Sequence, residues 1–80
     1  MKYVVTVTTT GGPMTDAHVA DLGRLGARVL RSDEPQWCEA TFRIEASDEP
    51  SASALAIEGV RAVRGDVTVD AVAVVPDPTA

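Results

Sequence analysis

The sequence predicts an α+β domain in which two helices cover one face of a four-stranded antiparallel sheet. An 80-residue chain has room for a single core. Segments rich in Val and Thr alternate between apolar and polar side chains, as strands do, and two other segments carry helix start and stop signals. The order along the chain is β-α-β-β-α-β. We therefore expect a single domain over residues 1–76, followed by a tail at 77–80.

Residues 2–9 form the first predicted strand, because Val, Thr and Tyr fit a pleated and half-buried surface. Side chains alternate across a strand, so one face would carry Tyr3, Val5 and Val7 and the other Val4, Thr6 and Thr8. Two glycines and a proline at 11–13 cannot continue a ladder comfortably, so the strand ends before them.

The first predicted helix begins near Thr15, whose hydroxyl can cap free amides, and ends at Gly26 in a left-handed conformation. Gly23 weakens the helix by about 1 kcal/mol relative to Ala, and we expect it to allow close approach to the sheet. The apolar side consists of Ala17, Val19, Ala20, Leu22 and Leu25, and the side facing water of His18, Asp21 and Arg24.

Residues 28–31 form a short strand, a turn follows at 32–35, and residues 36–46 show the clearest alternation in the chain. One face carries Cys38, Ala40, Phe42 and Ile44, and the other Trp37, Glu39, Thr41, Arg43 and Glu45. This pattern is typical of an antiparallel strand with one covered and one open face.

The second predicted helix starts at Ser47 or Asp48, with Pro50 in its first turn, and is terminated by Gly65. Its packing side would be Ala52, Leu55, Ala56, Gly59, Val60 and Val63. Residues 66–75 then form the last strand. Strict alternation places Val67, Val69, Ala71, Ala73 and Val75 on one face and Thr68, Asp70, Val72 and Val74 on the other.

Two right-handed crossovers joined by a hairpin give the strand order 4-1-3-2, with both helices on one face. This is the ferredoxin-like βαββαβ sandwich, and the outer face of its sheet is left bare. That open face would carry Val4, Thr6, Trp37, Thr41, Arg43, Val72 and Val74. Such a half-apolar face predicts an interface with a second copy or another protein. Trp37 either packs at the hairpin end or anchors this interface.

Composition excludes several kinds of partner. A net charge of −5 argues against nucleic acid and against an anionic membrane surface. No apolar run approaches about 18 residues, so no membrane span is predicted. The first residues lack the apolar region of a signal peptide, and the expected location is the cytoplasm.

Catalysis and cofactor binding are not predicted. The single Cys38 excludes an internal disulfide, and the single His18 excludes a histidine cluster for a metal. Cys38 is expected to be a small buried hydrophobe rather than a nucleophile, since no base is predicted beside it. We therefore expect a protein that is not an enzyme and holds no cofactor.

Residues 11–14 allow two interpretations. Free amides at the start of a helix can hold an anion, although the Gly-Lys-Ser/Thr ending of a phosphate loop is missing. The alternative is a turn that requires a positive φ angle.

A strand that ends in Gly12-Pro13, a helix, and then Leu25-Gly26-Ala27-Arg28-Val29 resembles the ACT domain over residues 3–31. ACT domains are amino-acid-sensing modules that commonly pair and bind an amino acid near the first strand–helix loop. The resemblance therefore implies a homodimer and an amino-acid site at Gly11, Gly12, Pro13 and Met14.

These observations predict a small non-catalytic regulatory or protein-interaction module, of bacterial or phage type. It would act through self-association or partner binding, and the ACT resemblance adds amino-acid sensing. The alternative is a host- or partner-directed accessory protein that binds another protein through the open sheet face.

Overall fold

The computed structural model describes residues 1–11, 14–33 and 36–78. The order of elements is the one expected from the sequence. Their bounds are β1 (Lys2–Thr10), α1 (Asp16–Arg24), β2 (Arg28–Asp33), β3 (Gln36–Glu45), α2 (Glu49–Val63) and β4 (Thr68–Pro76).

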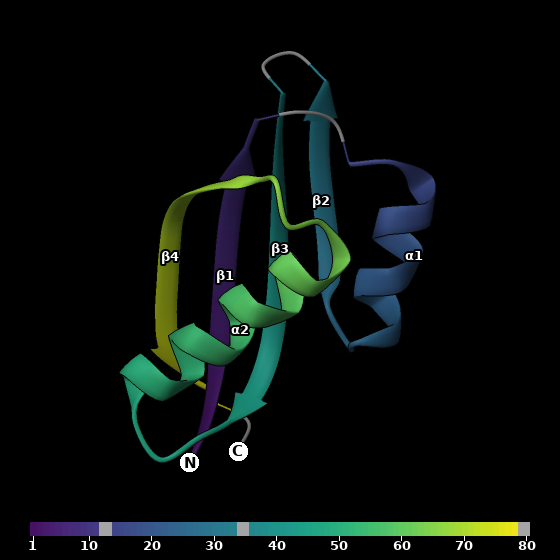
Figure 1. Ribbon diagram of the computed structural model, residues 1–80. Coiled ribbons are helices and arrows are strands. Elements are labelled where there is room, and N and C mark those ends of the chain that lie inside the picture. The colour runs from purple at the N-terminus through teal and green to yellow at the C-terminus, as the bar shows by residue number, and fades with distance from the viewer. Residues whose placement is uncertain (12–13, 34–35, 79–80) are drawn as a thin grey trace.

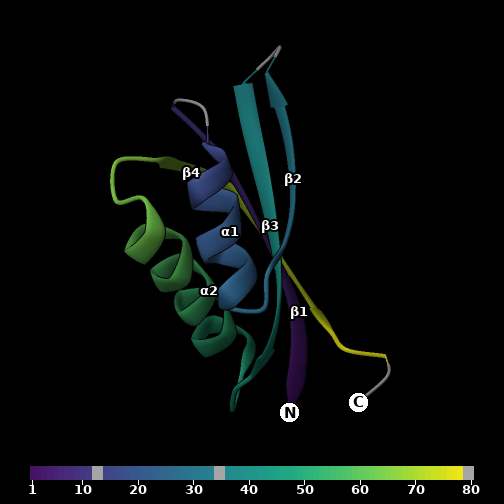
Figure 2. The ribbon, with the colours of Figure 1, turned by 90° about the vertical axis from the view of Figure 1, so that its right-hand side faces the viewer.

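The four strands form one antiparallel sheet in the order β2-β3-β1-β4 (Figure 1). Counted from the β4 edge, this is the order 4-1-3-2. Both helices lie on the same side of the sheet, and neither covers its other side (Figure 2). The α+β class is thereby confirmed, and the arrangement is compatible with a ferredoxin-like fold.

The core lies between the helices and the inward face of the sheet. Strand alternation supplies it as predicted, with Tyr3, Val5 and Val7 from β1 and Cys38, Ala40 and Phe42 from β3. The helices contribute the buried side chains Leu22, Ala52, Ala56 and Val60. Small residues on α2 bring its axis close to the sheet, so that the inward side chains of β1 are covered.

Helix α1 has a cap at each end. The Thr15 hydroxyl accepts from the His18 amide at 3.3 Å, and His18 Nδ1 accepts from the Thr15 amide at 3.1 Å. This is a capping box in which histidine takes the place of the usual Glu or Gln. At the other end Gly26, at φ 86°, lets its own amide and that of Ala27 satisfy carbonyls of the last turn.

Helix α2 begins as predicted and ends differently. The Ser51 amide donates to Asp48 Oδ1 at 2.9 Å, with Pro50 in the first turn. The chain leaves the helix through Arg64, which is extended at φ −147°. Gly65 is not in a left-handed conformation, so it is not the residue that terminates the helix.

The glycine that permits close packing lies on the other helix from the one predicted. A Cβ built on Gly23 would meet no atom within 4 Å, and the residue is exposed. A Cβ on Gly59 of α2 would lie 3.3 Å from Phe42 Cε1. The short helix α1 packs against β2 and α2, so only Leu22 of its expected apolar side is fully buried.

Strand β4 contains an irregularity that reverses its alternation. Thr8 pairs with Ala71 but Thr9 pairs with Val69, which leaves Asp70 as an extra residue. Beyond it, Val72 and Val74 pair with Val7 and Val5 and pack against the core. The prediction that Val72 and Val74 lie on the open face is therefore wrong, because strict alternation cannot be carried across a bulge. The residues turned outward are Ala71, Ala73 and Val75.

The last strand also reaches further than expected. It continues through Pro76, and the Asp77 amide donates to the Lys2 carbonyl at 2.9 Å. The Asp77 side chain is 3% exposed. The residue that the sequence places first in the tail is thus bound to β1.

The bulge leads to a matched prediction for one substitution at two positions of β4. Val72→Ala should lower the free energy of unfolding by about 1–2 kcal/mol, because it removes two methyl groups that pack against the core. Val75→Ala should cost less than about 0.5 kcal/mol, since its side chain lies outside the core. Urea unfolding at low protein concentration measures both. Equal costs, or a larger cost at Val75, would contradict the observed register.

Candidate interaction surface

The register defines which residues share the uncovered face of the sheet, hereafter the open face, because side chains paired across strands point to the same side. Its central row, from the β2 edge to the β4 edge, is Arg28, Thr41, Thr6 and Ala73. The row on one side is Leu30, Glu39, Thr8 and Ala71. Towards the other end follow Arg43, Val4 and Val75, and then Glu45 and Lys2.

Most of the residues predicted for this surface do lie together on it. Val4, Thr6, Thr41 and Arg43 occupy neighbouring positions on β1 and β3. Trp37 pairs with Ser32 and lies opposite in phase to the buried Cys38, which places it on the open face near the hairpin. Val72 and Val74 do not belong to the surface.

The largest exposed apolar side chains of the open face were not among those predicted. Leu30 is 59% exposed on β2 and Val75 is 52% exposed on β4, at opposite edges of the sheet. The predicted strand at 28–31 was too short to show an alternation that would orient Leu30. Strict alternation predicts Val75 on the same face as Val67 and Val69, because it takes no account of the bulge in β4. Both positions depend on pairing with a neighbouring strand.

The centre of the open face is polar and its hydroxyl groups are paired. Thr6 Oγ1 and Thr41 Oγ1 lie 3.2 Å apart in a hydrogen bond between β1 and β3. Both side chains are half-buried. One hydroxyl donates to the other, so each threonine side chain would keep one hydrogen-bond partner if a second protein covered the pair.

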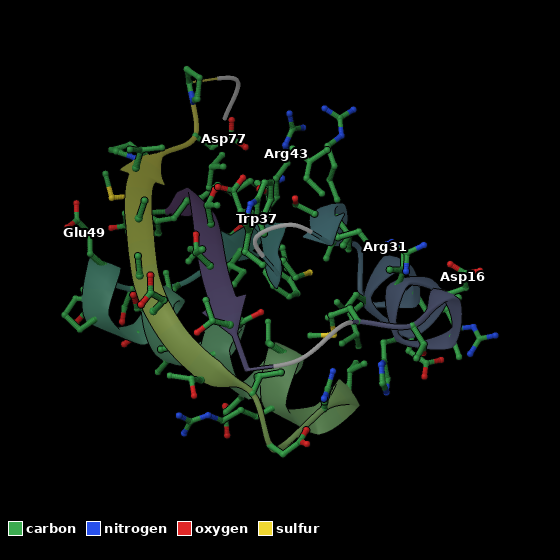
Figure 3. All side chains as sticks on the ribbon, turned by 90° about the horizontal axis from the view of Figure 1, so that it is seen from above. Asp16, Arg31, Trp37, Arg43, Glu49 and Asp77 are labelled. Atoms are coloured by element: carbon green, nitrogen blue, oxygen red, sulfur yellow. The ribbon has the colours of Figure 1, made fainter. Side chains whose placement is uncertain are left out.

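Charged groups of both signs surround that centre. Arg43 Nε lies 3.9 Å from Asp77 Oδ2, on the side of the molecule away from the helices (Figure 3). The terminal amino group lies 3.8 Å from Glu45 Oε1. Lys2 and Glu45 occupy paired positions, as do Glu39 and Leu30. The open face therefore carries positive and negative charges side by side rather than charges of one sign.

The predicted ligand loop is organised by a residue from β2. Gly11 is exposed with φ 101°, whereas Gly12 and Pro13 lie outside the described residues. Met14 is 4% exposed, because its side chain packs into the core. The Met14 carbonyl accepts from Arg31 Nη1 at 2.7 Å, and Arg31 Nη2 bonds Asp16 Oδ1 (Figure 3). Arg31 thus fixes the chain where it enters α1.

Three acidic or thiol groups have shifted pKa values. Burial raises the pKa of the Cys38 thiol, even though the nearby Arg31 charge lowers it. Hydrogen bonding to Ser51 lowers the pKa of the Asp48 carboxyl. A hydrogen bond from Arg64 Nε, 2.8 Å from Asp66 Oδ1, lowers the pKa of Asp66. Cys38 is therefore a buried, protonated thiol, and both aspartates are stabilised in their ionised form.

Within residues 1–11, 14–33 and 36–78, no three His, Cys, Asp or Glu side chains gather as metal ligands, and no pocket is formed. Neither described helix is long and apolar enough to cross a membrane. Comparisons of the chain with models of protein families, with curated proteins and with solved structures found no match.

The Asp48 cap predicts how stability changes with pH. Because the folded state lowers the pKa of this carboxyl below 3.8, the stabilisation is fully present above that value and is lost as the pH falls through the folded pKa. Asp48→Asn keeps a capping oxygen but cannot titrate. Below about pH 4 the wild type should therefore lose more stability than Asp48→Asn. Thermal melts from neutral to acidic pH test this, and parallel losses in the two proteins would contradict it.

Arg31 is predicted to stabilise the start of α1. Arg31→Met keeps an apolar stem but removes both hydrogen bonds, which should cost about 1 kcal/mol and speed amide exchange at Thr15–His18. The matched control is Arg24→Met. It breaks only the exposed pair with Asp21 and should cost less than about 0.5 kcal/mol. If both variants exchange alike in the first turn of α1, Arg31 does not hold this segment.

Proposed function

We propose that the protein is a non-catalytic interaction module that works by self-association, with the open face of its sheet as the contact surface. The observation that supports this proposal is that one face of the sheet is not covered by helices and carries exposed apolar side chains. Leu30 and Val75 are each more than half exposed on it, and Val4 and Trp37 add partly buried apolar area. Exposed apolar side chains on a sheet face that no helix covers favour an interaction site there.

The size of the domain adds a thermodynamic reason for pairing. A chain of 80 residues buries a modest share of its surface and is stabilised by one core. Covering the second face of the sheet would remove more apolar area from water, at about 25 cal/mol per Å². A partner that binds only the folded state raises its stability further.

The charges on the open face favour a protein partner with charges of both signs. Arg28, Arg43 and Lys2 lie among Glu39 and Glu45. Nucleic acid would require a basic face, and the chain carries a net charge of −5. A second copy carries the same mixed set, so each sign can meet its opposite.

Amino-acid sensing is not part of this proposal. Of the four residues that the ACT resemblance implies, Met14 directs its side chain into the core, and its carbonyl already accepts from Arg31. The accessory-protein hypothesis uses the same open face with a different partner. A wild-type protein that remains monomeric would leave that hypothesis for this surface.

Sedimentation velocity from low to high micromolar concentration tests the proposal. We expect a reversible dimer that Leu30→Lys weakens by about 30-fold in Kd, because both copies lose about 1 kcal/mol of leucine contact. Lysine is suitable at position 30 because its register partner is Glu39, which preserves the monomer.

Leu55→Lys is the matched control, since Leu55 is 48% exposed on α2, on the opposite side of the sheet. It should leave the Kd unchanged. Circular dichroism confirms that both variants are folded. A wild type that is monomeric at every concentration, or an equal weakening by Leu55→Lys, would overturn self-association through the open face.

A further inference from the structure

We infer that the two copies meet about a two-fold axis parallel to the strands, between β1 and β3, so that β2 of each copy lies over β4 of the other. This inference rests on the proposed self-association and specifies its geometry. A closed dimer of identical chains uses one patch twice, so the patch must be complementary to itself. The open face meets that condition in its shape and in its charges.

The shape of the open face is uneven from one edge to the other. At the β2 edge the outward side chains are Arg28 and Leu30, whereas at the β4 edge, in the same two rows, they are Ala73 and Ala71. One edge is therefore high and the other is low. An axis parallel to the strands sets the long side chains of each copy on the alanines of the other, which gives the complementarity that specific interfaces show.

The centre of the face suits the axis as well. Thr41 and Thr6 are neighbours of similar size on either side of it, and each would lie over the other residue of the second copy. Their hydroxyls already form a hydrogen bond within one chain. The centre therefore brings no unpaired polar side chain to the axis.

The charged residues follow the same symmetry. Lys2 and Glu45 are register partners on β1 and β3, so the axis places Glu45 of each copy over Lys2 of the other. Arg43 would lie over Val4, and its charge is balanced within its own chain by Asp77. Glu39 would lie over Thr8, which can donate a hydrogen bond to it. No two groups of like charge face each other.

The other axis compatible with two stacked sheets fits less well. This axis runs across the strands along the central row. It sets Glu39 of one copy over Arg43 of the other, but it also sets Arg28 directly over Arg28 of the other copy. That contact joins two like charges, which is unfavourable. It also carries Leu30, the most exposed of the large apolar side chains on the described strands, past the end of the partner's β2.

The available area is sufficient for a reversible dimer. Four strands about 4.8 Å apart and eight paired residues that each rise about 3.3 Å give a footprint of about 500 Å² per copy. Two copies then bury about 1,000 Å², which is the lower limit for a specific interface and the size of weak, transient contacts between proteins. Stacked sheets cross at about 30°, so the outer side chains shift by about one residue and Leu30 remains over the Ala71–Ala73 pair.

Thiol cross-linking tests the axis. The double variant Leu30→Cys/Ala71→Cys is made in a Cys38→Ala background, because Cys38 is the one native thiol. A thiol-reactive linker that spans about 10 Å, the distance between stacked sheets, should convert most of the protein to covalent dimer on a denaturing gel. Each single variant should give less than about a tenth as much covalent dimer, since its two identical cysteines, one in each copy, lie at opposite edges of the interface. Arg28→Cys/Ala73→Cys reports the same axis and leaves Leu30 in place.

Ala73→Cys alone is the indicator of the other axis, because only that arrangement sets position 73 over itself. Sedimentation of the same samples before cross-linking shows whether a dimer forms at all, independently of its axis. Dimers that cross-link through Ala73→Cys alone, or through neither double variant, would overturn this axis and leave self-association standing. A wild type that does not dimerise would overturn the proposed function itself.

Discussion

The structure depends on β1 being paired on both sides while its side chains alternate between two environments. β1 lies between β3 and β4 and forms ladders with both, and Val5 and Val7 on its inward face are fully buried. Those valines require a cover, which the helices provide from one side only. Because two helices cannot cover both faces of a four-stranded sheet, the polar outward face of β1 becomes the centre of a surface rather than of a core.

The sequence was sufficient to predict a structural feature wherever the interaction that controls it is local. The alternation of β3, the Thr15 and Asp48 caps and the left-handed Gly26 each depend on neighbours within a few residues, and all are present. The role of the two helical glycines was not predictable in this way. Whether a helix approaches an aromatic ring depends on where Phe42 lies relative to Gly59, and that is set by tertiary packing.

The open face could be predicted for the two central strands and not for the edges. Val4, Thr6, Thr41 and Arg43 follow from alternation within long strands. The outward position of Leu30 and the docking of Asp77 follow from pairing with β3 and β1, which no single segment encodes. Likewise, nothing in the sequence near Met14 indicates that Arg31, seventeen residues later, bonds its carbonyl.

The bulge at Asp70 connects the core to the surface. Without the extra residue, the phase set by Val67 and Val69 would turn Ala71 and Ala73 inward and Val72 and Val74 outward. The core would then receive alanines where it now receives valines, and the β4 edge of the open face would carry valines in place of alanines. One irregular residue therefore does two things at once. It fills the space beside Val5 and Val7, and it leaves the low edge against which the long side chains of β2 in a second copy can pack.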